Sequence, residues 1–152
     1  MRSPVYWHPL LYRSLMKLLY GSHFEDRYRA ISDLIPEGSQ VTELCMGDAY
    51  LYLNYLRNKK VHYLGLDINP AFVQYAQRKG VNARIHNLDT DIIPLSDFMI
   101  LQASLYQFIP HHKNLVNKIL SSTRQVLILA EPVKILASGK NPVIAFIAKY
   151  SA

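Results

Sequence analysis

Small and acidic residues follow two hydrophobic segments of this sequence, and their spacing is typical of a nucleotide site. The first segment, residues 41–45, runs into Met46-Gly47-Asp48-Ala49, and the second, residues 61–66, ends at Asp67. Small residues let the backbone approach a ligand, and the start of the next helix offers free N–H groups. A carboxylate at Asp67 can accept hydrogen bonds from both hydroxyls of a ribose. These residues therefore predict a nucleotide-type site; the alternative for Asp67 is a turn or helix-capping residue.

Two classes of cofactor would place different residues on the glycines of this turn. In the Gly-x-Gly-x-x-Gly pattern of dinucleotide sites, Tyr50 takes the third position, where its ring would block helix–strand contact. In a Gly-x-Gly-x-Gly pattern the three positions are Cys45, Gly47 and Ala49, which are all small. Glu43 then lies near the end of the strand, where a carboxylate repels a pyrophosphate and attracts an ammonium group. The carboxylate favours a cofactor that carries an amino group, unless Glu43 is a buried ion-pair partner.

Four segments in order resemble the class I S-adenosylmethionine-dependent methyltransferases, and the resemblance runs over residues 28–132. Residues 41–49 resemble the first motif, 63–70 the second, 87–89 with Ile93-Pro94 the third, and 97–102 the fourth strand with its following residue. The resemblance implies S-adenosylmethionine as cofactor, with Asp67 on the ribose and Asp89 on the adenine amino group, although Asp89 could instead be a surface-loop acid. The cofactor-binding set that it implies is Glu43, Leu44, Cys45, Gly47, Asp67, Ile68, Asn69, Leu88, Asp89 and Gln102.

The first motif departs from the family pattern at two positions. Cys45 replaces its first glycine and Ala49 its third, and each adds bulk close to the expected place of the methionine part. Reduced or absent cofactor affinity is therefore one alternative. A catalytic role for the Cys45 thiol is disfavoured, because the chemistry at this turn is binding.

The catalytic candidates follow the fourth and fifth expected strands, in segments that line the acceptor pocket of the resembled family. They are Tyr106, His111 and Glu131. Methyl transfer from a sulfonium mainly needs donor and acceptor to be aligned, and a base helps only where the nucleophile must lose a proton. His111 could be such a base, whereas Tyr106 and Glu131 are expected to line the pocket. No metal site is expected.

The elements that must position these residues alternate between helix and strand. We expect helices over 9–20, 24–34, 50–58 and 69–80, around 115–120, and from 142 onward, and strands over 41–45, 61–66, 83–86, 98–101 and 126–130. Such alternation predicts an α/β fold, a doubly wound and mostly parallel sheet with helices on both faces. The apolar run at 126–129 predicts a strand that is covered on both faces. Leu115, Val116, Ile119 and Leu120 give their helix an apolar stripe.

The chain of 152 residues has room for one domain. We expect N-terminal helices in 1–38, a cofactor-binding core in 39–132 and a C-terminal helix in 133–152. The last strands of the usual seven-stranded sheet are not expected, either because the chain is a fragment or because they are absent. The exposed sheet edge would then need cover, by the C-terminal helix or by a second copy in a homo-oligomer.

Charge and hydropathy narrow the class of partner. The 17 Lys and Arg against 11 Asp and Glu leave a net charge of +6, but the bases are scattered, without an aromatic-interleaved stripe. No Asn/Asp-Pro-Pro-Tyr signature, which some base-modifying relatives carry, follows the fourth strand; the residues there are Gln102-Ala103-Ser104-Leu105.

No apolar run approaches the roughly 20 residues that cross a bilayer. One cysteine and no signal-peptide pattern favour the cytoplasm.

The sequence therefore predicts a methyltransferase that acts on an unidentified acceptor, with a small molecule favoured over nucleic acid. The alternatives are a non-catalytic, methyltransferase-like binding or interaction domain and, less favoured, a nucleic-acid methyltransferase.

Overall fold

A five-stranded parallel sheet forms the centre of the computed structural model, which describes Arg13, Ser14, Lys17 and residues 24–131. The strands are β1 (Gln40–Leu44), β2 (His62–Asp67), β3 (Ala83–Ile85), β4 (Ser96–Gln102) and β5 (Thr123–Ala130). They lie in the order β3-β2-β1-β4-β5, and all four neighbouring pairs are parallel. The strand order reverses between β1 and β4, which is where such sheets bind ligands.

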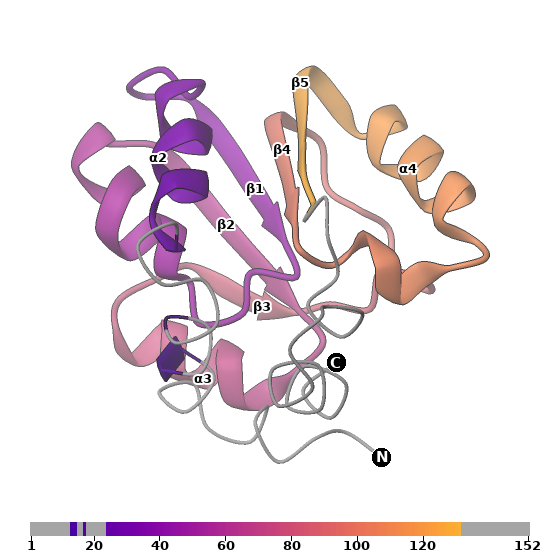
Figure 1. Cartoon of the computed structure of the whole chain (residues 1–152), viewed down its shortest axis with the longest axis horizontal. Helices are drawn as coiled ribbons and strands as arrows, with labels where there is room; N and C mark the ends of the chain where they lie inside the picture. Colours follow the sequence, from indigo (N-terminus) through magenta and orange to yellow (C-terminus); the bar gives the residue numbers. More distant parts are fainter. Residues whose placement is uncertain (1–12, 15–16, 18–23, 132–152) are drawn as a thin grey trace, which may run out of the picture.

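Helices cover the two faces of this sheet and bury a separate hydrophobic cluster on each (Figure 1). On one face lie α2 (Asp26–Asp33), the short helical segments η3 (Tyr52–Leu56) and η4 (Arg57–Lys59), and α3 (Pro70–Arg78). On the other lies α4 (His112–Ser121), preceded by the 3-10 turn η5 (Leu105–Phe108). The predicted doubly wound α/β fold is confirmed.

The ends of α3 follow from its local sequence. The Asn69 side chain accepts a hydrogen bond from the Ala71 N–H at 3.0 Å, and Pro70 occupies the first helical position. Gly80 has φ +75°, the left-handed conformation that glycine adopts without steric cost. These are the start and stop signals that the sequence predicts for a helix over 69–80.

The helix that was expected over 50–58 is present, but most of it is not α-helical. It contains a five-residue π-helix, η3, followed by the 3-10 turn η4. The Tyr52 ring stacks on Tyr63 with centroids 4.3 Å apart, and the Tyr55 hydroxyl donates to Glu25 at 3.0 Å. Both tyrosines of this segment thus have contacts with residues distant in sequence, which local helix propensity does not encode.

The prediction that residues 126–129 are covered on both faces is wrong for the part of the chain that the structure describes. Ile128 is 8% exposed, whereas Val126 and Leu129 are 41% and 42% exposed. The reason is that β5 is the edge strand of the described sheet and pairs with β4 alone. Leu120 was expected in the apolar stripe of its helix, but it is 51% exposed, whereas Leu115 and Ile119 are buried.

The predicted C-terminal helix from residue 142 lies outside the described residues, as does the expected helix over 9–20 apart from Arg13, Ser14 and Lys17, which are helical. None of the helices within the described ranges is long and apolar enough to cross a membrane.

Candidate functional site

The turn after β1 is built from left-handed residues. Cys45, Gly47 and Ala49 have φ values of 52°, 57° and 55°. Only glycine adopts this conformation freely; another L-residue loses about 1–2 kcal/mol there. The backbone thus has left-handed φ at the three positions that the Gly-x-Gly-x-Gly register assigns to glycine, although two of them carry a side chain.

Asp67 ties this turn to the end of β2. Its Oδ2 accepts a hydrogen bond from the Gly47 N–H at 2.9 Å, and its Oδ1 accepts one from the Asn69 N–H at 2.8 Å. The residue is 8% exposed. Asp67 therefore acts as a turn residue here, through both of its carboxylate oxygens. Its role on a ribose stays a prediction.

Glu43 lies in a buried chain of side chains on one face of the sheet. In the sheet register Glu43 is opposite Gly65 of β2 and Ile100 of β4, so Tyr63 and Gln102 share its face, two residues away. The Tyr63 hydroxyl donates to Glu43 Oε2 and Gln102 Nε2 donates to Oε1, both at 2.6 Å. Glu43 is 0% exposed. Burial raises its pKa to about 7, although both hydrogen bonds act in the opposite direction.

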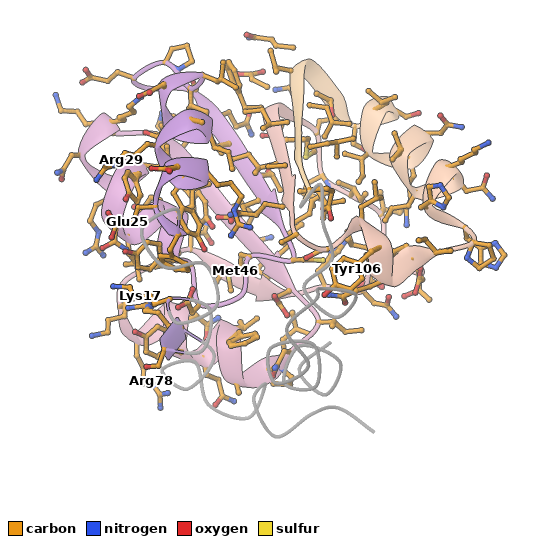
Figure 2. All side chains as sticks on the ribbon, in the orientation of Figure 1. Lys17, Glu25, Arg29, Met46, Arg78 and Tyr106 are labelled. Carbon is orange, nitrogen blue, oxygen red and sulfur yellow. The ribbon has the colours of Figure 1, made fainter. Side chains whose placement is uncertain are left out.

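A small pocket of about 30 Å³ opens beside these hydrogen-bonded side chains, at the carboxyl ends of β1 and β4. Its lining residues come from α2, from the turn after β1 and from the end of β4: Arg27, Tyr28, Cys45, Met46, Gly47, Asp48, Tyr50, Gln102, Ala103 and Ser104. Figure 2 shows Met46 near the centre of this view, between Glu25 and Tyr106. Gly65 makes room for Met46, since a Cβ at Gly65 would collide with Met46 Sδ.

Of Cys45 and Gln102, two polar side chains of the pocket lining, only Gln102 is a candidate ligand contact. Burial raises the pKa of the Cys45 thiol to about 12, so it stays protonated and is a poor nucleophile. Gln102 is 8% exposed, and its buried Oε1 accepts no hydrogen bond from the residues that the structure describes. A buried acceptor without a donor is unfavourable, which makes Gln102 a candidate ligand contact.

The N-terminal residues reach this site through ion-pair and aromatic contacts that the sequence did not predict. Arg13 Nε lies 2.7 Å from Asp48 Oδ2, and the Arg13 guanidinium lies over the Tyr50 ring, 4.9 Å from its centroid. The Tyr50 hydroxyl donates to Glu25 at 3.1 Å. Burial raises the pKa of Asp48, whereas Arg13 acts to lower it. No pattern in the sequence links residues 35 positions apart, so only the fold reveals this pair.

The third predicted motif forms a turn held by its own side chains. The Asn87 side chain accepts from the Asp89 N–H at 3.0 Å, and Lys118 Nζ donates to the Leu88 carbonyl at 2.6 Å. Asp89 is exposed and Leu88 is buried at 5% exposure. Ile68, directly after β2, is 45% exposed. Their contacts with an adenine stay predictions, as does that of Asn69, which caps α3.

The catalytic candidates do not meet at the pocket. Glu131 Oε1 accepts hydrogen bonds from the backbone N–H groups of Ser104 and Leu105, at 2.9 and 3.0 Å. Tyr106 lies half-buried in η5, and His111 is exposed at the start of α4. None of the three is among the residues that line the pocket. Within the described ranges, no group of His, Cys, Asp and Glu is placed to hold a metal ion.

Comparison with solved structures identifies the fold. A TehB-like S-adenosylmethionine-dependent methyltransferase from Corynebacterium glutamicum matches with TM-score 0.66 and 15% identity, over 93% of this chain and 78% of that one. Coclaurine N-methyltransferase, solved with N-methylheliamine and SAH, matches with TM-score 0.60 and 17% identity, over 76% and 42%. The cyclase SpnF matches with TM-score 0.63 and 14% identity, over 71% and 44%. The chain thus spans less than half the length of the last two proteins.

The protein therefore has the fold of class I S-adenosylmethionine-dependent methyltransferases, as the resemblance predicted. A cyclase with the same fold illustrates that fold alone does not fix the reaction. A search of curated protein sequences found no match. The family model described as methionine biosynthesis protein MetW matches residues 25–145, and the chain belongs to this family.

Proposed function

We propose that the protein binds S-adenosylmethionine at the carboxyl ends of β1, β2 and β4. The observation that carries the proposal is the left-handed turn at Cys45, Gly47 and Ala49, joined to Asp67 through the Gly47 N–H. In this proposal Asp67 holds the ribose, Ile68 and Asp89 contact the adenine, and the turn and Gln102 hold the methionine part. A solved relative of the same fold carries SAH, which supports this choice of cofactor.

The size of the pocket sets a condition on binding. The pocket is small, with a volume of about 30 Å³. We expect side chains at its opening to adjust when the methionine part of the cofactor enters. Arg27 and Tyr28, which reach the pocket from α2, are the residues that we expect to move.

We further propose that the protein transfers the methyl group to a small molecule whose attacking atom already has a free lone pair. Bound S-adenosylmethionine supplies a methyl group on a positively charged sulfur. Of the described lining residues, Tyr28, Cys45 and Tyr50 have pKa values raised to about 12 by burial. Asp48 is paired with Arg13. These residues can position an acceptor, but none is poised to remove its proton near neutral pH.

A second candidate function is cofactor binding without methyl transfer. It is favoured by the placement of Tyr106, His111 and Glu131 outside the pocket lining, and by the side chains of Cys45 and Ala49 at the glycine positions. Such a domain would use the bound cofactor to recognise partners. We favour a cytoplasmic protein in either case, because its one cysteine is a free, protonated thiol.

Isothermal titration calorimetry with SAH, S-adenosylmethionine and NAD tests the proposed cofactor. We expect SAH to bind and NAD to bind much more weakly. Asp67→Asn should weaken SAH binding, since each hydrogen bond to a charged acceptor contributes about 1.5–3 kcal/mol. Asp97→Asn, at the opposite end of the sheet, is the matched control and should bind as the wild type does.

Tighter binding of NAD than of SAH would contradict the proposal. An assay of labelled methyl transfer from S-adenosylmethionine to a panel of amines and thiols then separates the two candidate functions. Tight SAH binding without transfer to any acceptor would favour the non-catalytic domain.

A further inference from the structure

The Gln102 carboxamide contacts a buried carboxylate and lines the pocket, and one of its two polar atoms has no partner among the described residues. Its Nε2 donates to Glu43 Oε1 at 2.6 Å, whereas Oε1 is buried without a hydrogen bond. Gln102 lines the pocket and is 8% exposed. An acceptor in this position lacks a donor, and a ligand that enters the pocket can supply one.

The charge of Glu43 decides which atom of Gln102 is left for a ligand. An ionised carboxylate only accepts hydrogen bonds, and both partners of Glu43, the Tyr63 hydroxyl and the Gln102 amide, donate to it. A protonated Glu43 has a hydrogen to donate, and Gln102 can accept it after its amide has turned by about 180°. The donor Nε2 would then take the place of Oε1. Ionised Glu43 therefore leaves an acceptor of Gln102 for the ligand, which suits a hydrogen-bond donor such as an N–H group.

We propose that Gln102 Oε1 recognises the amino group of the bound ligand, and that binding releases a proton from Glu43 to solvent. A ligand ammonium group close to Gln102 and Glu43 favours the ionised form of the Glu43 carboxylate. It thereby holds the Gln102 amide in its present orientation. The inference rests on the proposed function, because the amino group is that of S-adenosylmethionine or SAH. It makes Gln102 a specificity-determining residue of that site, and it couples ligand binding to the loss of a proton from Glu43.

The tyrosines and the thiol that act on Glu43 do not change their charge near neutral pH. Burial raises the pKa of Tyr63 well above its usual value, and raises those of Tyr28 and Cys45 to about 12. Asp48 and Arg27 act on the pKa of Glu43 in opposite directions, and Asp48 is paired with Arg13. With its pKa at about 7, Glu43 is the group among these that can exchange a proton when ligand binds.

Calorimetry of SAH in two buffers of different ionisation enthalpy measures the exchanged proton directly. We expect binding to release about half a proton at pH 7, and affinity to rise about tenfold between pH 6 and pH 8. The control ligand is 5′-methylthioadenosine, which keeps the nucleoside and thioether but lacks the amino-acid part and therefore the α-amino group. It should bind without releasing a proton and with a flat pH profile. This comparison needs only the wild-type protein.

Two variants assign the effect to residues. Glu43→Gln should remove the release of the proton, because an amide at this position has no proton to release near neutral pH. Gln102→Leu should weaken SAH binding at least tenfold and leave methylthioadenosine binding unchanged. Gln125→Leu, an exposed glutamine in β5, is the matched control and should bind both ligands as the wild type does.

The outcomes separate this inference from the function on which it rests. SAH binding without proton release, or equal release with methylthioadenosine, would overturn the inference and leave the proposed function standing. Equal loss of both ligands in Gln102→Leu would also overturn it, because Gln102 would then have only a structural role. Absence of SAH binding at every pH would overturn the proposed function and the inference together.

Discussion

Cys45 carries a side chain at a position whose backbone favours glycine. Its φ of 52° is left-handed, and the half-buried thiol lines the pocket. We expect Cys45→Gly to raise the free energy of unfolding by about 0.5–1 kcal/mol, because relief of about 1–2 kcal/mol exceeds the entropy cost of glycine. Urea denaturation measures the change.

The control for this substitution is Ala71→Gly in α3, where the backbone is helical and glycine should be destabilising. Destabilisation by Cys45→Gly as large as that of the control would show that no strain is relieved. Cys45→Leu probes binding at the same position. We expect it to block SAH while the fold is kept, and unchanged SAH affinity would show that this side chain does not face the cofactor.

Glu43 also makes stability depend on pH. Its pKa in the folded protein is about 7, above the usual value of 4.5, so the folded state holds more protons than the unfolded state between these values. The contribution of Glu43 to stability is therefore fully present below about pH 4.5 and is lost as pH rises through 7. We expect Glu43→Gln to gain stability relative to the wild type at pH 7.5, and to gain little at pH 4. Denaturation curves at several pH values test this, and a difference independent of pH would contradict it.

The sequence indicated part of this chemistry at the residue scale. Asp67 and Gly47 could be assigned to one site because the strand ends and the turn residues have recognisable types. The chain from Tyr63 through Glu43 to Gln102 could not be predicted, since it depends on the register of three strands. The distance along the chain between Glu43 and Gln102 is 59 residues, and no local pattern encodes it.

At the scale of elements, Glu131 holds the end of β5 against the start of η5. One carboxylate oxygen accepts the N–H groups of Ser104 and Leu105. We expect Glu131→Ala to cost about 1–3 kcal/mol, because two backbone donors lose their partner. Glu131→Gln keeps an acceptor and should cost less. Thermal denaturation measures both, and equal stability of wild type and Glu131→Ala would exclude this role.

The bounds of α3 could be predicted, whereas the form of η3 could not. Asn69, Pro70 and Gly80 act through local backbone chemistry, which the sequence displays directly. The π-helical turn of η3 accompanies contacts of Tyr52 and Tyr55 with residues distant in sequence. The apolar run of β5 was misleading for a similar reason, since the coverage of a strand depends on its neighbours in the sheet.

At the scale of the whole molecule, the sheet separates two cores, and β5 contributes unequally to them. Ile128 packs into the cluster on the α2 face, whereas Leu129 is 42% exposed. We expect Ile128→Ala to cost about 2–5 kcal/mol, as for other buried aliphatic residues. Leu129→Ala on the same strand should cost less than half as much. Urea denaturation compares the two, and equal losses would mean that Leu129 is covered in solution.

The reversal of strand order between β1 and β4 also has a consequence for the order of folding. The pocket needs the ends of both strands, yet Val41 of β1 pairs with Phe98 of β4, and β2, α3 and β3 lie between them in the sequence. Parallel pairing across such a separation is slow, because a long loop must close before its contacts form. A growing chain can complete the turn at residues 45–49 long before it has a ligand site. Ligand can then engage only after β4 has docked, so it acts on the rate of unfolding rather than on the first steps of collapse.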